Sequence, residues 1–155
     1  MRDFLKKERP WFANVMKTAH GEITNAQGGS AIDSQSNYVD LITAAGDGLL
    51  IDAVVLTSND SAARVVIISR KVSGTYRPIG AIQIAANAGT NGTTASIDAL
   101  SGAIIAGLPI NAQGKRFIRL ENGQALAFKV TTAVTNTAGM AVRASVSGVQ
   151  YQSES

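Results

Sequence analysis

From about Ser36 onward, short runs of β-branched residues alternate with Gly, Asn, Asp and Ser along the chain. Short apolar runs bounded by turn-forming residues are typical of β-strands. A close succession of such runs predicts an all-β fold, and specifically an antiparallel β-sandwich that is jelly-roll-like. The length of 155 residues fits one domain of this class.

The first 35 residues have a different pattern. Residues 1–20 mix basic and aromatic side chains, and residues 21–35 are polar and glycine-rich, as flexible linkers are. We therefore expect an N-terminal arm and linker over residues 1–35 and the β-sandwich over residues 36–155. Five basic and two acidic residues in the first 20 account for the whole net charge of +3. The sandwich is therefore neutral overall and presents no pattern that indicates direct nucleic-acid binding.

The clearest strand signal lies in residues 116–130, around the turn at Glu121-Asn122-Gly123. A three-residue hairpin loop with Gly123 in the left-handed conformation would pair Leu120 with Gln124. This register is preferred because a slip of one residue turns every side chain to the opposite face. It places one set of apolar residues on the buried face: Ile118, Leu120, Leu126, Phe128 and Val130. It places Arg119, Glu121 and Lys129 on the other face.

The last strand shows the same alternation. Even-numbered apolar residues from Met140 to Val146 alternate with small or polar ones. After Gly148 the apolar positions become Val149 and Tyr151, so we expect a β-bulge at the glycine and a reversal of the buried face.

Residues 49–56 and 65–68 are apolar at both odd and even positions, which predicts strands that are covered on both faces. The second cover could be the N-terminal segment, a long loop such as residues 85–110, or another subunit. We favour a subunit contact and therefore expect a homo-oligomer, with a trimer as the favoured form. Within the loop, Ser96 or Asp98 could cap a short helix over residues 99–105.

The sequence offers little material for catalysis. It contains no cysteine, and its single histidine, His20, falls where the arm meets the linker, a poor position for a catalytic base. Residues Gly114-Lys115-Arg116 resemble the end of a phosphate-binding loop, but Pro109 occupies the position of the required glycine. We expect no enzymatic activity, no catalytic residue and no cofactor.

Acidic residues give no metal-binding pattern either. Asp33, Asp40 and Asp47 recur every seven residues without the spacing of a calcium loop, so we expect strand ends and turns there and no metal site. Asp52 interrupts an apolar strand, and we expect it to form an ion pair at a sheet edge or between subunits, with Arg64 or Arg143 as candidate partners.

The arm is the most suggestive segment for binding. Aromatic side chains beside Arg and Lys are the usual composition of an interface anchor. We expect partner contacts from Phe4, Lys6, Lys7, Arg9, Trp11 and Phe12. Pro10 could begin a short helix that continues to Lys17. The alternative is that the arm folds back onto its own sandwich.

Several stretches resemble a family of tailed-bacteriophage virion proteins. They are residues 48–56, residues 87–93, Gly107-Leu108-Pro109-Ile110, and residues 114–121 with the chain that follows, so that the resemblance covers about residues 36–151. It implies a small β-sandwich protein of the capsid decoration (cement) or accessory head or tail kind, which often self-associates.

On this resemblance we expect a decoration protein that binds the assembled head. The implied partner is the major capsid protein or another virion protein, and the implied location is the capsid surface. The N-terminus does not have the pattern of a secretory signal peptide, so we expect synthesis in the host cytoplasm, without a membrane partner. The alternatives are a tail or baseplate accessory protein and a carbohydrate-binding host-adhesion module that uses Tyr38 or Tyr76.

Overall fold

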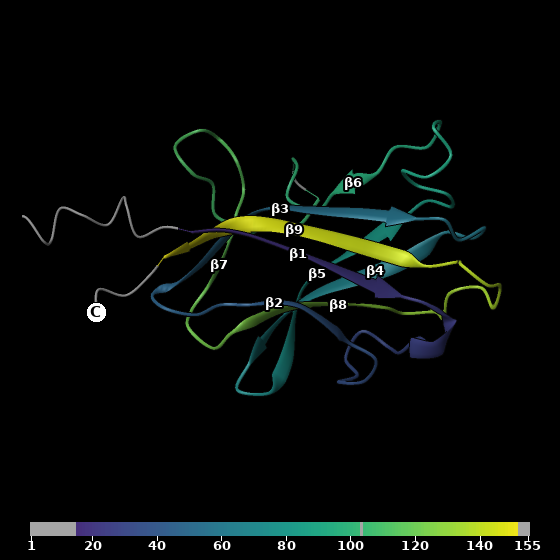
Figure 1. The fold of residues 1–155 in the computed structure, drawn as a ribbon, viewed down its shortest axis with the longest axis horizontal. Coiled ribbons are helices and arrows are strands. Elements are labelled where there is room, and N and C mark those ends of the chain that lie inside the picture. The colour runs from purple at the N-terminus through teal and green to yellow at the C-terminus, as the bar shows by residue number, and fades with distance from the viewer. Residues whose placement is uncertain (1–14, 103, 152–155) are drawn as a thin grey trace, which may run out of the picture.

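The computed structural model describes residues 15–102 and 104–151. Within them, nine strands form two antiparallel sheets that pack face to face (Figure 1). Sheet I has the order β1-β9-β3, with β6 and β7 both pairing along the free side of β3; sheet II has the order β2-β8-β4-β5. The strands of sheet I are β1 (Val15–Ile23), β3 (Gly48–Ser58), β6 (Ile97–Asp98), β7 (Ile118–Leu120) and β9 (Val142–Tyr151). Those of sheet II are β2 (Val39–Thr43), β4 (Arg64–Val72), β5 (Thr75–Ile84) and β8 (Ala125–Val130).

The pairing of the strands is nested from the ends of the described chain inward. The first strand pairs with the last, β2 with β8, β3 with β6 and β7, and β4 with β5. A long antiparallel hairpin rolled up in this way gives a jelly roll. The predicted all-β sandwich is therefore confirmed.

The core lies between the inner faces of the two sheets. Its members come from every strand except the two-residue β6, and the connection before β7 adds Leu100 and Ile105. All five apolar residues that the alternation assigned to the interior are buried: Ile118, Leu120, Leu126, Phe128 and Val130. Alternation of side chains across each strand thus brings a continuous apolar layer between the sheets.

Strand β1 occupies part of the segment for which the sequence predicted an arm and a linker. All nine of its residues pair with β9. A Cβ atom on Gly21 would lie 2.5 Å from Leu41 Cδ2 and 2.9 Å from Phe128 Cε1, so the glycine allows β1 to lie close against sheet II. The boundary expected at residue 36 does not fit this arrangement, and Val15–Lys17 are extended, not helical. After β1, the 3₁₀-helix η2 (Asn25–Gln27) is closed by a Thr24–Gln27 capping box.

The predicted hairpin around Gly123 is wrong. Strand β7 pairs with β3 in sheet I, whereas β8 pairs with β2 and β4 in sheet II. The intervening turn, in which Gln124 N donates to Glu121 O over 3.0 Å, carries the chain from one sheet to the other. Gly123 has the expected positive φ of 83°. Lys129 is fully buried, contrary to its predicted place on the solvent side.

The predicted reversal of the buried face in β9 is also wrong. Alternation continues to the strand end, so that Gly148 and Gln150 are buried and Tyr151 is exposed. The extra residue lies instead in the partner strand, because the β3–β9 register shifts between Ile51 and Ala53. Asp52 is therefore the bulged residue, and Gly148 lies opposite the bulge.

Residues 29–38 cover part of the outer face of sheet II. Lys129 Nζ donates to the carbonyls of Ala31 and Ser34 over 2.5 and 2.6 Å, and Ser30 N donates to Val130 O. The chain itself therefore supplies this cover, for which a second subunit was favoured. The loop proposed as the alternative, residues 85–110, extends the edge of sheet I through β6 and fills the core, and its described residues 99–102 form turns where a helix was expected.

Candidate functional site

The outer face of sheet I is the main candidate interaction surface. At the end where β1 begins and β9 ends, Met16, Val149 and Leu50 lie directly opposite one another on three adjacent strands. We call these three residues the apolar row. Met16 is 67% exposed, and Val149 and Leu50 are partly exposed. Tyr151, on the same face two residues beyond Val149, is 38% exposed. Neighbours across strands pack side by side, so the row forms one continuous patch.

The remainder of this face is mainly polar, apart from Ala53 and Val55 of β3. His20 Nδ1 lies 2.9 Å from the Ser145 hydroxyl oxygen, and Arg143 Nε donates to Glu22 over 2.8 Å. A hydrolase triad needs a carboxylate that orients the histidine. The neighbouring carboxylate, Glu22, is instead engaged by Arg143. His20 is exposed in the middle of β1 and not at an arm–linker junction.

A groove of about 630 Å³ lies beside the bulge in β3. Sheet I contributes Asp52, Asp98 and Ser147, and the loop before β7 contributes Lys115 and Arg116. Asp52 Oδ1 accepts a hydrogen bond from the Ser147 hydroxyl over 3.2 Å. Within the chain, Asp52 does not form the expected pair with Arg64 or Arg143, because those arginines bind Asp60 and Glu22.

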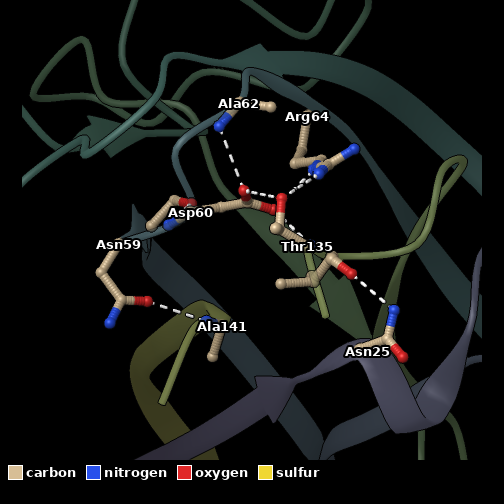
Figure 2. Close-up of polar contacts among 9 residues, drawn as sticks. Asn25, Asn59, Asp60, Ala62, Arg64, Thr135 and Ala141 are labelled. Atoms are coloured by element: carbon tan, nitrogen blue, oxygen red, sulfur yellow. Dashed lines mark hydrogen bonds and ion pairs between the residues drawn. The ribbon is translucent and has the colours of Figure 1, made fainter. Parts of the chain in front are cut away.

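A buried carboxylate, which sequence reasoning missed, joins two loops at the opposite end of the sandwich (Figure 2). Asp60, after β3, accepts hydrogen bonds from Arg64 Nε at 2.6 Å, from the Thr135 hydroxyl at 2.6 Å, and from the backbone N–H groups of Thr135 and Ala62. Burial alone would raise the pKa of Asp60, but these donors outweigh it and hold the pKa well below its usual range. The available signal was an aspartate directly after an apolar strand, four residues before an arginine.

In the same cluster, Asn59 holds the β8–β9 connection. Its side chain accepts a hydrogen bond from Ala141 N over 2.8 Å (Figure 2). It also donates to Gly139 O over 2.8 Å. Asn25 Nδ2 donates to Val134 O over 2.7 Å from the other side. These hydrogen bonds connect the β3–β4 turn and η2 to the β8–β9 connection. The cluster therefore has a structural role, which is to hold these loops together. Because its lowered pKa keeps Asp60 ionised at neutral pH, this carboxylate is poorly suited to act as a general acid or base.

The rings of the two tyrosines considered for glycan binding stack on each other. The Tyr38 and Tyr76 rings stack with centroids 4.1 Å apart. Lys129 Nζ lies 4.6 Å from the Tyr38 centroid, and Lys71 Nζ lies 5.0 Å from that of Tyr76. The rings therefore already have partners for stacking, which disfavours them as a sugar platform. Asp40 accepts from Tyr76 Oη and Lys71 Nζ, both over 2.8 Å.

The described residues contain no group of three or more His, Asp or Glu side chains placed to hold a metal ion. Asp33 and Asp47, the other members of the seven-residue series, are exposed in loops. Within the same residues, no helix has the length and apolar character needed to cross a membrane. The anchors expected in the arm lie outside the described residues: Phe4, Lys6, Lys7, Arg9, Trp11 and Phe12.

These features define a jelly-roll protein with a two-part outer face on sheet I, apolar at one end and polar at the other. No protein-family model and no curated protein matches its sequence. Among solved structures, the chain is similar to one in the Cyanophage Pam1 capsid asymmetric unit. The TM-score is 0.44 with 14% sequence identity, over 90% of this chain and 87% of the other.

Proposed function

We propose that this chain is a structural protein of a tailed-phage virion, and specifically a decoration protein that binds and stabilises the assembled capsid. The observation that carries the proposal is the exposed apolar row on sheet I, at the point where the basic and aromatic N-terminal segment joins β1. Exposed apolar groups rimmed by polar residues are typical of protein-binding surfaces. The resemblance of residues 36–151 to virion proteins supports the same class of partner.

Binding would depend on burial of apolar surface. Specific interfaces typically bury ~1,600 Å² in total, and a few aromatic anchors supply most of the binding free energy. In this proposal Phe4, Trp11 and Phe12 are the apolar anchors. Lys6, Lys7 and Arg9 add attraction to acidic groups on the capsid surface, which raises the association rate. The proposed role requires no catalysis, and self-association into a homo-oligomer would multiply the contacts.

The fold is compatible with this function. Jelly rolls occur in viral capsid and lectin domains, and a fold alone does not determine function. The stacked arrangement of Tyr38 and Tyr76 favours the virion role over the glycan-binding one. The outer face of sheet I is then the surface turned towards the particle.

Deletion of residues 1–14 tests the anchoring role, because the truncation ends just before β1 and leaves the sheet intact. The full chain should co-sediment with purified heads of the phage that encodes it, and the truncated chain should remain in the supernatant. A Lys6→Glu, Lys7→Glu, Arg9→Glu variant should bind more weakly, whereas Lys115→Glu, in an exposed loop, should bind as the native chain does.

Thermal unfolding of each variant establishes that loss of binding is not loss of fold. Undiminished co-sedimentation of the truncated chain would contradict the anchoring role. Failure of the full chain to bind heads, with binding to purified tails, would replace the decoration role by that of a tail accessory protein.

A further inference from the structure

The β4–β5 hairpin carries two arginines side by side near its tip. Arg70 of β4 lies directly opposite Arg77 of β5, and on its other side it lies opposite Leu126 of β8. Directly opposite residues on adjacent strands share one face of a sheet, and Leu126 belongs to the core. Both arginines therefore belong to the inner face of sheet II, at the border between the core and the tip of the hairpin. This tip projects from the sandwich (Figure 1), and Arg77 is exposed while Arg70 is partly exposed.

Neither guanidinium group has a counter-charge within residues 15–102 and 104–151. None of the ion pairs between these residues includes Arg70 or Arg77. The Nε atom of Arg70 is buried and has no hydrogen-bond partner, and it is the only side-chain nitrogen or oxygen atom of the described chain in this condition. Lys71, which follows Arg70 on the opposite face of β4, is by contrast bound by Asp40. The hairpin thus pairs its cation on the outer face and leaves its two cations on the inner face without an acceptor in the described chain.

This arrangement favours the binding of an anion. Like charges that lie directly opposite on adjacent strands destabilise a sheet. A buried donor without an acceptor loses its hydration with no compensating hydrogen bond, and the loss is larger when the donor is charged. One carboxylate group would correct both faults, because its two oxygen atoms accept paired hydrogen bonds from a guanidinium group. Opposite Cβ atoms are about 5 Å apart, so two arginines so placed can reach the same carboxylate.

We propose that Arg70 and Arg77 form a binding site for a carboxylate group. Arg70 stands beside the core and supplies a fixed donor, and the exposed Arg77 closes on the ligand from the solvent side. The carboxylate comes either from a free dicarboxylate or from an acidic side chain of a protein partner. The site lies on sheet II, whereas the proposed function assigns capsid binding to the outer face of sheet I and the N-terminal segment. The inference therefore goes beyond the proposed function and does not depend on it.

The NMR signal of the Arg70 Nε–H group in the full chain reports directly on this site. Titration with succinate, at an ionic strength held constant with sodium chloride, should shift this signal and that of Arg77 until they saturate. Arg77→Gln should weaken the binding about tenfold or more, since it removes hydrogen bonds from a charged donor. Arg119→Gln is the matched control, because it removes the same charge from an exposed position of β7 and should leave the affinity nearly unchanged.

A capped peptide with two glutamates separated by one glycine distinguishes the two sources of the carboxylate. Saturation of the Arg70 signal at a lower concentration of this peptide than of succinate would assign the ligand to a protein partner. Saturation at an equal or higher concentration would assign it to a free dicarboxylate. Either result supports the site, because the signal of Arg70 itself is followed.

Arg70→Met gives a second, independent measurement. In a buffer that contains chloride and no carboxylate, this variant should be as stable to heat as the native chain or more so, because it removes a buried donor without an acceptor. Succinate should raise the Tm of the native chain, since it binds the folded state, and should not raise that of Arg70→Met.

Three results would overturn the inference: no saturable shift at Arg70 Nε, undiminished affinity in Arg77→Gln, or a marked loss of stability in Arg70→Met. None of these measurements involves phage particles, so their outcome is independent of the test of head binding.

Discussion

The Oδ2 atom of Asp60 lies 2.6 Å from the Nε atom of Arg64, in a position where the Asp60 side chain has no exposed surface. Together with Thr135, this pair links the β3–β4 turn to the β8–β9 connection. A buried ion pair does not by itself guarantee stability, because both charges lose their hydration. Removal of one partner is nevertheless costly, since the other charge is left buried and unpaired.

Asp60→Ala should therefore lower the free energy of unfolding by about 3–5 kcal/mol. Urea unfolding at neutral pH measures the change. The matched control is Asp40→Ala, which breaks the ion pair of Asp40 with Lys71, whose side chains are 40% and 32% exposed. Solvent screens such a pair, so its loss should be much smaller. An equal decrease in the free energy of unfolding in the two variants would contradict the role of Asp60 in holding the two loops together.

Asp60 should also make the stability of the chain depend on pH in the acid range. The donors around Asp60 lower its pKa in the folded chain below the value of 3.8 that applies after unfolding. The stabilisation is therefore fully present above pH 3.8 and is lost as the pH falls towards the folded-state pKa. Asp60→Asn should remove this part of the acid sensitivity. Urea midpoints measured across pH 2–6 should converge for the native chain and the variant towards low pH; parallel curves would show that Asp60 does not titrate as described.

The bulge in β3 allows a second prediction. A Cβ atom on Gly148 would lie 2.4 Å from Leu50 O and 3.0 Å from Ile51 Cα, both of which are backbone atoms. Since backbone cannot move aside as a flexible side chain can, Gly148→Ala should destabilise by about 3 kcal/mol, the upper end of the range for overpacking. Ser147→Ala, at the neighbouring position, removes only the 3.2 Å hydrogen bond to Asp52 and should cost less. Differential scanning calorimetry compares the two; a neutral Gly148→Ala would show that strands β3 and β9 can move apart at the bulge.

Alternation along the strands predicted the sandwich and its core residues, because burial of one face imposes a period of two. It did not predict which strands pair. A hairpin and a turn that crosses between sheets both bury Ile118, Leu120, Leu126 and Phe128, so the pattern cannot separate them. Gly123 has a positive φ in either arrangement. Pairing is a long-range property that the local sequence does not encode.

The outer faces were harder to predict for a related reason. Lys129 stands at a polar position in the alternation, and its burial depends on residues 29–38, about 95 positions earlier in the chain. Strand β1 was missed because one of its faces is exposed and the other contains Gly21, so its apolar signal is weak. The apolar row consists of single residues from three strands and becomes visible only when the strands are in register.

Lys129 leads to a third prediction. Lys129→Met keeps much of the side-chain volume but leaves the carbonyls of Ala31 and Ser34 without their donor, at a cost of about 1–3 kcal/mol. Residues 29–38 should exchange their amide hydrogens faster. In the core strand β8, exchange should accelerate only as much as the decrease in global stability requires. Hydrogen exchange followed by mass spectrometry resolves the two segments. Uniform acceleration over both would contradict the role of Lys129 as the local attachment.

Lys129→Met should also change how the free energy of unfolding depends on pH in the alkaline range. Burial lowers the pKa of Lys129 in the folded chain below the 10.5 of an unfolded lysine, and the nearby charge of Asp33 opposes this only in part. Unfolding therefore takes up a proton in the interval between these two pKa values, and the contribution of Lys129 to stability rises with pH there. The difference in unfolding free energy between the native chain and Lys129→Met should grow across this interval. A difference that is constant with pH would contradict the lowered pKa.

The last prediction concerns the edge of sheet II at β5. The Gln35 side chain accepts a hydrogen bond from Tyr76 N over 2.7 Å and donates to Tyr76 O over 2.9 Å, so one amide group satisfies both backbone groups. Unpaired edge groups would otherwise be open to another strand. Gln35→Ala should leave global stability nearly unchanged while the Tyr76 amide loses its protection from hydrogen exchange. Gln35→Glu retains the acceptor and should preserve that protection in part. NMR exchange rates at Tyr76 decide the matter, and a Tyr76 amide that stays fully protected in Gln35→Ala would show that this contact does not close the edge.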